Sequence, residues 1–168
     1  MSCFNEFLNC LRFPSSAVAV INGSNKYPSI RGKTDFYKAR DGIIVRTVIK
    51  GLPKNNEICQ SPIFAFHIHN GDTCTGNETD PFANANGHFN PQKCYHPYHA
   101  GDLPPLFSAN GKAVSVFLTD RFNLTDIIGK TVIIHNNPDD FTTQPSGNSG
   151  EKIACGVIVE QNQKRLSH

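Results

Sequence analysis

Six of the seven histidines in this sequence lie in one central stretch, and their spacing suggests metal binding. His67 and His69 are two residues apart in the run Phe64–His69. In a strand, both imidazoles therefore point to one face, while Phe66 and Ile68 point to the other. Two imidazoles on one face can reach a single ion. Alone, such a pair is a weak indication, because exposed histidines on strands are ordinary.

The residues that follow strengthen the indication. His88, His96, His99 and Asp102 fall within fifteen residues, and His135 ends a β-branched run that needs a buried setting. Six histidines and one aspartate are too many ligands for one four-coordinate ion. They suit two sites, a nitrogen-rich one for copper or zinc and a zinc site of three histidines and a carboxylate.

The elements that must position these residues are short strands separated by turns. Apolar and β-branched runs, bounded by Gly, Pro, Asn or Asp, indicate about eight strands and an all-β sandwich or barrel. We expect Thr125 to cap a single helical turn before Gly129. The expected strands are Ala17–Ile21, Arg31–Tyr37, Gly42–Lys50, Ile63–His69, Leu106–Ser108, Ala113–Leu118, Thr131–His135 and Ile153–Glu160.

Two segments are too long to be simple connections between strands. Residues 70–105 have almost no apolar periodicity, and residues 136–151 have none. Loops of this length in a compact domain are usually functional or disordered. Because the first loop carries three of the seven histidines, we expect both to be functional.

Length and composition bound the remaining possibilities. The 168 residues are typical of one domain, and 16 basic against 14 acidic residues give a net charge of +2 without charge blocks. This argues against a nucleic-acid partner. A hydrophobic content of 38% and a mean hydropathy of −0.35, with no run near the ~20 apolar residues of a membrane span, argue against a membrane protein.

The first residues form a separate segment. Phe4, Phe7, Leu8 and Leu11 recur at helical spacing, so we expect an N-terminal extension with a short amphipathic helix over residues 1–14 and the main domain over residues 15–168. This segment lacks the basic start and cleavage site of a secretory signal. We therefore expect a cytoplasmic protein, or an extracellular or periplasmic one if a leader was removed.

Five motifs resemble those of the copper/zinc superoxide dismutases, in the same order along the chain. The resemblance covers residues 15–159, and the compact loop around His96 and His99 is similar to that of bacterial members. It implies an eight-stranded Greek-key barrel, an immunoglobulin-like sandwich that is commonly a homodimer. The motifs are Phe66–His69, Gly87–Pro91, His99–Leu103, His135–Asp140 and Ala154–Ile158.

The resemblance also implies an oxidoreductase that disproportionates the superoxide anion to dioxygen and hydrogen peroxide. By this resemblance, the ring of His88 would bridge the two metal ions. When copper is reduced, this ring would take up a proton and later give it to the peroxide. Asp139 matches the carboxylate that links a copper-ligating histidine to a zinc-ligating one. Copper would be bound by His67, His69, His88 and His135, and zinc by His88, His96, His99 and Asp102.

A positive charge beside copper would attract the anionic substrate. The family has an arginine two residues before its Ala-Cys-Gly motif, and this sequence has Lys152 there, preceded by Glu151. Lysine keeps the charge but loses the planar fork of arginine. The loop 136–150 has no Lys or Arg. We therefore expect a slower association with superoxide and a modest dependence on salt.

Six cysteines allow fifteen full pairings, so their number alone selects none. The resemblance implies a disulfide between Cys74 and Cys155. We hypothesise a second bridge between Cys59 and Cys94, which would fix the long loop. We expect Cys3 and Cys10 to be unpaired within the chain.

Two other functions compete with the enzyme. One is a non-catalytic copper/zinc-binding protein of the same fold, which the presence of all four copper histidines disfavours. The other is an adhesion or ligand-binding sandwich with purely structural metals, because a fold does not define a function. An open coordination position at copper would separate an enzyme from this second alternative.

Overall fold

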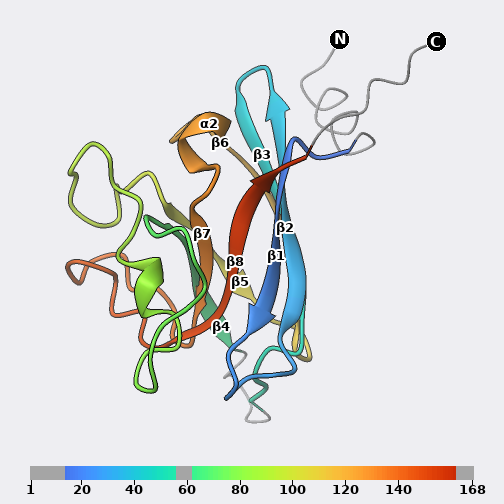
Figure 1. Ribbon diagram of the computed structural model, residues 1–168, viewed down its shortest axis with the longest axis vertical. Helices are drawn as coiled ribbons and strands as arrows, with labels where there is room; N and C mark the ends of the chain where they lie inside the picture. Colours follow the sequence, from blue (N-terminus) through green and yellow to red (C-terminus); the bar gives the residue numbers. More distant parts are fainter. Residues whose placement is uncertain (1–13, 56–61, 162–168) are drawn as a thin grey trace.

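The chain, described here by a computed structural model over residues 14–55 and 62–161, is an all-β barrel. Its strands are antiparallel in the order β5-β4-β7-β8-β1-β2-β3-β6, and β5 approaches β6 where the sheet closes (Figure 1). The predicted eight-stranded all-β fold is confirmed. The strands are β1 Ala17–Gly23, β2 Arg31–Ala39, β3 Gly42–Lys50, β4 Ile63–His69, β5 Asp102–Phe107, β6 Lys112–Thr119, β7 Thr131–His135 and β8 Lys152–Glu160.

Alternating side chains fill the interior of the barrel. In β1, Ala17, Ala19 and Ile21 are fully buried, whereas Val20 on the opposite face is 59% exposed. The inward side chains of the other strands join them in one apolar cluster that includes Phe36 and Phe66. Removing this apolar surface from water provides the main driving force for the fold.

Two crossings of the chain bring the metal-site strands together. The connections from β3 to β4 and from β6 to β7 join strands that are not neighbours, as in a Greek key. They place β4 beside β7. The loop that follows β4, which contains the 3-10 helix η1 (Ala83–Ala85), and the loop that follows β7 lie on the same side of the barrel (Figure 1).

The structure differs from the sequence prediction in two short elements. β5 begins at Asp102 rather than Leu106, because an edge strand tolerates the missing N–H groups of Pro104 and Pro105. The helical turn α2 (Leu124–Ile127) is capped by Asn123 and not by Thr125. The Asn123 backbone N–H donates to the Asp126 carboxylate at 2.9 Å, which fixes the start of the turn.

The N-terminal helix predicted from Phe4, Phe7, Leu8 and Leu11 lies outside the described residues, which begin at Pro14. Cys3, Cys10 and Cys59 also lie outside them. Within the described ranges, no helix has the length and apolar character needed to cross a membrane.

Candidate metal centre

Two paired strands carry three of the histidines. His67 and His69 lie on one face of β4, while Phe66 and Ile68 belong to the core. β7 pairs with β4 and ends at His135, one residue beyond the partner of Phe66. All three histidines are buried, with exposed fractions of 3% or less. The strand register therefore fixes their relative positions.

Backbone carbonyls determine which nitrogens of His69 and His135 are free. The Nδ1–H of His69 donates to the Asn86 carbonyl at 2.6 Å, and that of His135 donates to the Gly150 carbonyl at 3.2 Å. This leaves both Nε2 atoms as lone-pair donors, 3.1 Å apart. Two lone pairs that face each other at this distance need a cation between them.

Asp139 fixes two further rings. Its Oδ2 accepts from the Nε2–H of His67 at 2.7 Å, and its Oδ1 accepts from the Nε2–H of His96 at 2.8 Å. The backbone N–H of Phe141 donates to the same carboxylate at 2.7 Å. The Nδ1 atoms of His67 and His96 are thereby turned inward: that of His67 is buried without a hydrogen-bond partner, and that of His96 lies 3.0 Å from Asp102 Oδ2.

The ring of His88 belongs to both clusters of ligands. Its Nδ1 lies 2.7 Å from Asp102 Oδ1 and 3.4 Å from His99 Nδ1. Its Nε2 is buried and has no hydrogen-bond partner. The structure brings together two groups of ligand atoms. Within each group, all the ligand atoms lie within 4.8 Å of one another. One group is His67, His69, His88 and His135, and the other is His88, His96, His99 and Asp102.

The donor atoms fit copper and zinc. The first group offers four imidazole nitrogens, a set that suits copper or zinc. The second offers three imidazole nitrogens and one carboxylate, a tetrahedral zinc set. Two of the ring nitrogens, His67 Nδ1 and His88 Nε2, are buried without a hydrogen-bond partner, and His96 Nδ1 lies 3.0 Å from Asp102 Oδ2. A bound cation would satisfy these orphaned lone pairs.

The protonation states also suit metal binding. Burial is the main cause that lowers the pKa of His67 to about 4 and that of His135 to about 3. Burial likewise lowers the pKa of His69 well below its ordinary value. These rings are therefore neutral near pH 7, which is the form that binds metals.

The two carboxylates of the centre remain ionised. Burial alone would raise the pKa of Asp102, but the hydrogen bond with His88 and the nearby histidines bring it below its ordinary value. Burial would likewise raise the pKa of Asp139, and the hydrogen bonds from His67, Phe141 and His96 lower it instead. Both side chains can thus act as acceptors and compensate cationic charge.

The loop that carries His96 is held by residues that the sequence analysis did not identify. The Gln144 side chain accepts from the His96 backbone N–H at 3.0 Å and donates to the His96 carbonyl at 2.8 Å. Gly147 has a positive φ, and a Cβ there would collide with the Asp139 carboxylate. No ligand-type spacing marks these positions, so only the folded loops reveal them.

Arg121 supports the same loop from the other side. Its Nη1 lies within donating distance of three backbone carbonyls, those of Pro97 at 3.0 Å, His99 at 3.2 Å and Asp102 at 3.1 Å. Two of these residues supply ligand atoms to the second group. Arg121 follows β6, and nothing in its sequence surroundings indicates this contact.

Lys152 lies opposite His135 where β8 begins. Its ammonium donates to Asp80 Oδ2 at 2.5 Å and to the Phe82 carbonyl at 3.3 Å. Glu151, which we expected to weaken the local positive field, is bound by Lys26 at 2.8 Å. The charge of Lys152 is therefore beside the histidines, but it is paired with a carboxylate.

The cysteines follow one prediction and contradict another. Cys74 and Cys155 form a disulfide that joins the long loop to β8, as expected. The predicted bridge between Cys59 and Cys94 is wrong, since Cys94 is an exposed free thiol. The Asn90 side chain holds the Cys94 backbone, and Cys94 lines the cavity beside His69, His88 and His135.

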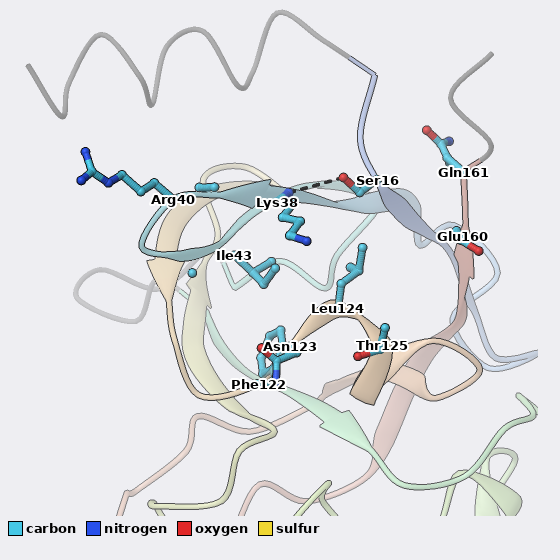
Figure 2. Close-up of a pocket in the computed structure, with 12 residues that line it drawn as sticks. Ser16, Lys38, Arg40, Ile43, Phe122, Asn123, Leu124, Thr125, Glu160 and Gln161 are labelled. Atoms are coloured by element: carbon cyan, nitrogen blue, oxygen red, sulfur yellow. Dashed lines mark hydrogen bonds between the residues drawn. The ribbon is translucent and has the colours of Figure 1, made fainter. Parts of the chain in front are cut away.

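Two large cavities lie at opposite ends of β8. The cavity beside the histidines has a volume of about 840 Å³ and includes Lys152 in its lining. The other, of about 710 Å³, reaches Glu160, and Figure 2 shows Lys38 and Arg40 at its rim above Leu124. No metal-ligand group of the described residues lies there. Chemistry therefore identifies the first cavity as the site.

Comparisons with known proteins agree with this chemistry. The sequence model of the family described as "Copper/zinc superoxide dismutase (SODC)" matches residues 30–158. The chain is 33% identical over 149 residues to a Cu-Zn superoxide dismutase 2 of Aquifex aeolicus, covering 80% of this chain and 82% of the relative. It is 34% identical over 139 residues to the Cu-Zn enzyme of Legionella pneumophila, covering 78% and 79%.

Solved structures show the same likeness. A double mutant of a SOD-like protein from Bacillus subtilis matches with a TM-score of 0.69 at 28% identity, over 86% of this chain and 99% of that one. The Cu/Zn superoxide dismutase from Brucella abortus matches with a TM-score of 0.70, over 84% and 98%. At 22% identity, this second likeness concerns the fold alone.

Proposed function

The chain belongs to the copper/zinc superoxide dismutase family, and we propose that its two histidine groups divide the two metals between them. It is an oxidoreductase that converts superoxide into dioxygen and hydrogen peroxide, with copper and zinc as cofactors. In the proposed assignment, His67, His69, His88 and His135 hold copper, and His88, His96, His99 and Asp102 hold zinc.

The observation that carries this assignment is the position of the His88 ring. One of its nitrogens faces Asp102 at 2.7 Å and the other is buried and unpartnered among the remaining histidines. When bound, copper supplies the one-electron chemistry by alternating between two oxidation states. His88 Nε2 is placed to hold a proton and to release it to the peroxide, as a general acid.

Other residues orient the ligands and admit the substrate. Asp139 keeps the His67 and His96 protons on Nε2, so that both Nδ1 atoms stay available. The cavity of about 840 Å³ gives a small anion access to His69, His88 and His135, and Lys152 supplies a positive charge at its wall. We propose that Lys152 draws superoxide toward this cavity.

The non-catalytic alternative is not favoured. Such a protein would not need an open approach to a complete set of copper nitrogens, and here all four histidines converge beside a cavity. A purely structural site is closed.

The test is to reconstitute the full chain with both metals and to measure metal content and superoxide consumption on one sample. We expect about one copper and one zinc ion per chain. Activity should require copper, so protein loaded with zinc alone should be inactive. His88→Gln should lose the link between the two sites. Equal activity of the zinc-only sample, or failure to take up copper, would reject the proposal.

We further propose that the chain forms a homodimer. Val114, Val116 and Leu118 lie on the outer face of β6 with exposed fractions of 71%, 38% and 47%, and Phe107 on the closing strand β5 is 68% exposed. Soluble monomers seldom expose large contiguous apolar patches. A second copy of the chain, related by a two-fold axis, can cover this stripe.

A further inference from the structure

We propose that Asp80 weakens the attraction of superoxide to the metal centre by neutralising Lys152, an inference that rests on the proposed function. The Lys152 ammonium is 2.5 Å from Asp80 Oδ2. Both residues line the cavity that leads to His69, His88 and His135. A substrate anion that enters this cavity therefore meets an ion pair and not an isolated cation.

The pairing follows from the way the loop is attached. The disulfide between Cys74 and Cys155 joins the Asp80 loop to β8, three residues beyond Lys152. Phe82 packs in the same small apolar cluster as Cys155, and its carbonyl accepts from Lys152 at 3.3 Å. The Lys152 side chain is only 15% exposed and that of Asp80 is 38% exposed, so solvent screens the ammonium, though not the carboxylate, less than at an open surface.

The pair of Lys152 and Asp80 determines the electrostatic field that an anion meets in this cavity, because the other charged side chains of the described lining are few or already paired. Apart from histidines, Lys152 is the only cationic side chain in the described lining, and Asp80 and Glu151 are the acidic ones. Glu151 is engaged by Lys26 at 2.8 Å and by the Tyr27 hydroxyl at 3.2 Å. Removing the charge of Asp80 would therefore leave Lys152 uncompensated, and an uncompensated cation raises the encounter rate of an anion.

Asp80→Asn tests the proposal because the amide keeps an acceptor oxygen for Lys152 and removes only the charge. In the protein loaded with both metals, we expect kcat/KM for superoxide to rise roughly two- to threefold at low ionic strength. The rise should disappear as added salt shortens the screening length. In the Lys152→Ala background, Asp80→Asn should give no rise.

Glu78→Gln is the matched control, since it makes the same change of charge in the same loop. A second measurement is the affinity of azide, a small monovalent anion, for the loaded protein, which should increase in Asp80→Asn by a similar factor. An equal gain in Glu78→Gln, a gain that persists with Lys152→Ala, or unchanged rates and azide affinity would overturn the inference. A wild-type protein without dismutase activity whose azide affinity still rises in Asp80→Asn would reject the proposed function and support the charge effect.

Discussion

Asp139 is the residue on which both halves of the centre depend. One carboxylate accepts from His67 and from His96, which belong to different ligand groups. Because an ionised carboxylate only accepts hydrogen bonds, it assigns the ring proton of each histidine to Nε2. The lone pairs available for metal are therefore determined by a residue that supplies no ligand atom to either group.

Replacing Asp139 by Asn should weaken both metal sites. The amide cannot accept from two rings and from the Phe141 backbone N–H with the strength of a carboxylate, and comparable changes cost about 10- to 100-fold in metal affinity. Competition with a chelator would measure the affinities for copper and zinc. Asp140→Asn, at an exposed neighbouring carboxylate, is the control and should leave both nearly unchanged.

The buried histidines make the metal-free protein sensitive to acid. The pKa of His67 is lowered to about 4 and that of His135 to about 3, from 6.5. Below pH 6.5 the unfolded chain takes up protons that the folded chain refuses, so the unfolding free energy falls as the pH drops toward 4. The expected loss is about 3 kcal/mol for each ring.

Denaturant titrations of the metal-free protein between pH 7 and pH 4 would measure this dependence. His135→Asn should reduce it by about 3 kcal/mol, because this ring no longer titrates while His67 and His69 still do. A stability that is flat over this range would contradict the prediction.

Arg121 links β6 to the loop that bears the zinc ligands. By donating to the carbonyls of Pro97, His99 and Asp102, it holds a segment without regular secondary structure. Arg121→Ala should release these carbonyls and increase the rate of zinc loss by about tenfold, as expected for one lost charge-assisted hydrogen bond. Arg121→Lys should restore part of the effect, because the lysine point charge cannot contact all three carbonyls.

The absorption spectrum of cobalt placed in the zinc site would report this distortion independently of activity. Arg40→Ala, at the far end of the barrel, is the control. An unchanged cobalt spectrum and an unchanged zinc-release rate in Arg121→Ala would show that the contact does not position the ligands.

The strands could be predicted where the side-chain alternation is regular. β3, β4 and β7 have the predicted bounds, and His67 and His69 lie on one face of β4 as their spacing requires. β5 was predicted too short because Pro104 and Pro105 hide an edge strand. The loop contacts of Gln144 could not be predicted, because they depend on two segments that meet only after the barrel closes.

The apolar stripe on β6 makes a prediction for the assembly of the whole protein. Val114→Asp places a charge in the proposed dimer interface and should weaken dimerisation by at least about tenfold. Val159→Asp, on an exposed position of β8, is the matched control and should leave association unchanged. Sedimentation of the metal-loaded protein would measure both, and a wild-type protein that sediments as a monomer would contradict the proposal.

The two ligand groups differ in the secondary structure from which their side chains come. His67, His69 and His135 stand on strands locked by their hydrogen-bond ladder, whereas His96, His99 and Asp102 depend on a loop and on the start of β5. Warming the protein should therefore release its ions in sequence, because an irregular segment opens before a central ladder does. Zinc would be released first. The chain would then pass through a species that still binds copper but no longer has a metal ion at Nδ1 of His88, the nitrogen that faces Asp102.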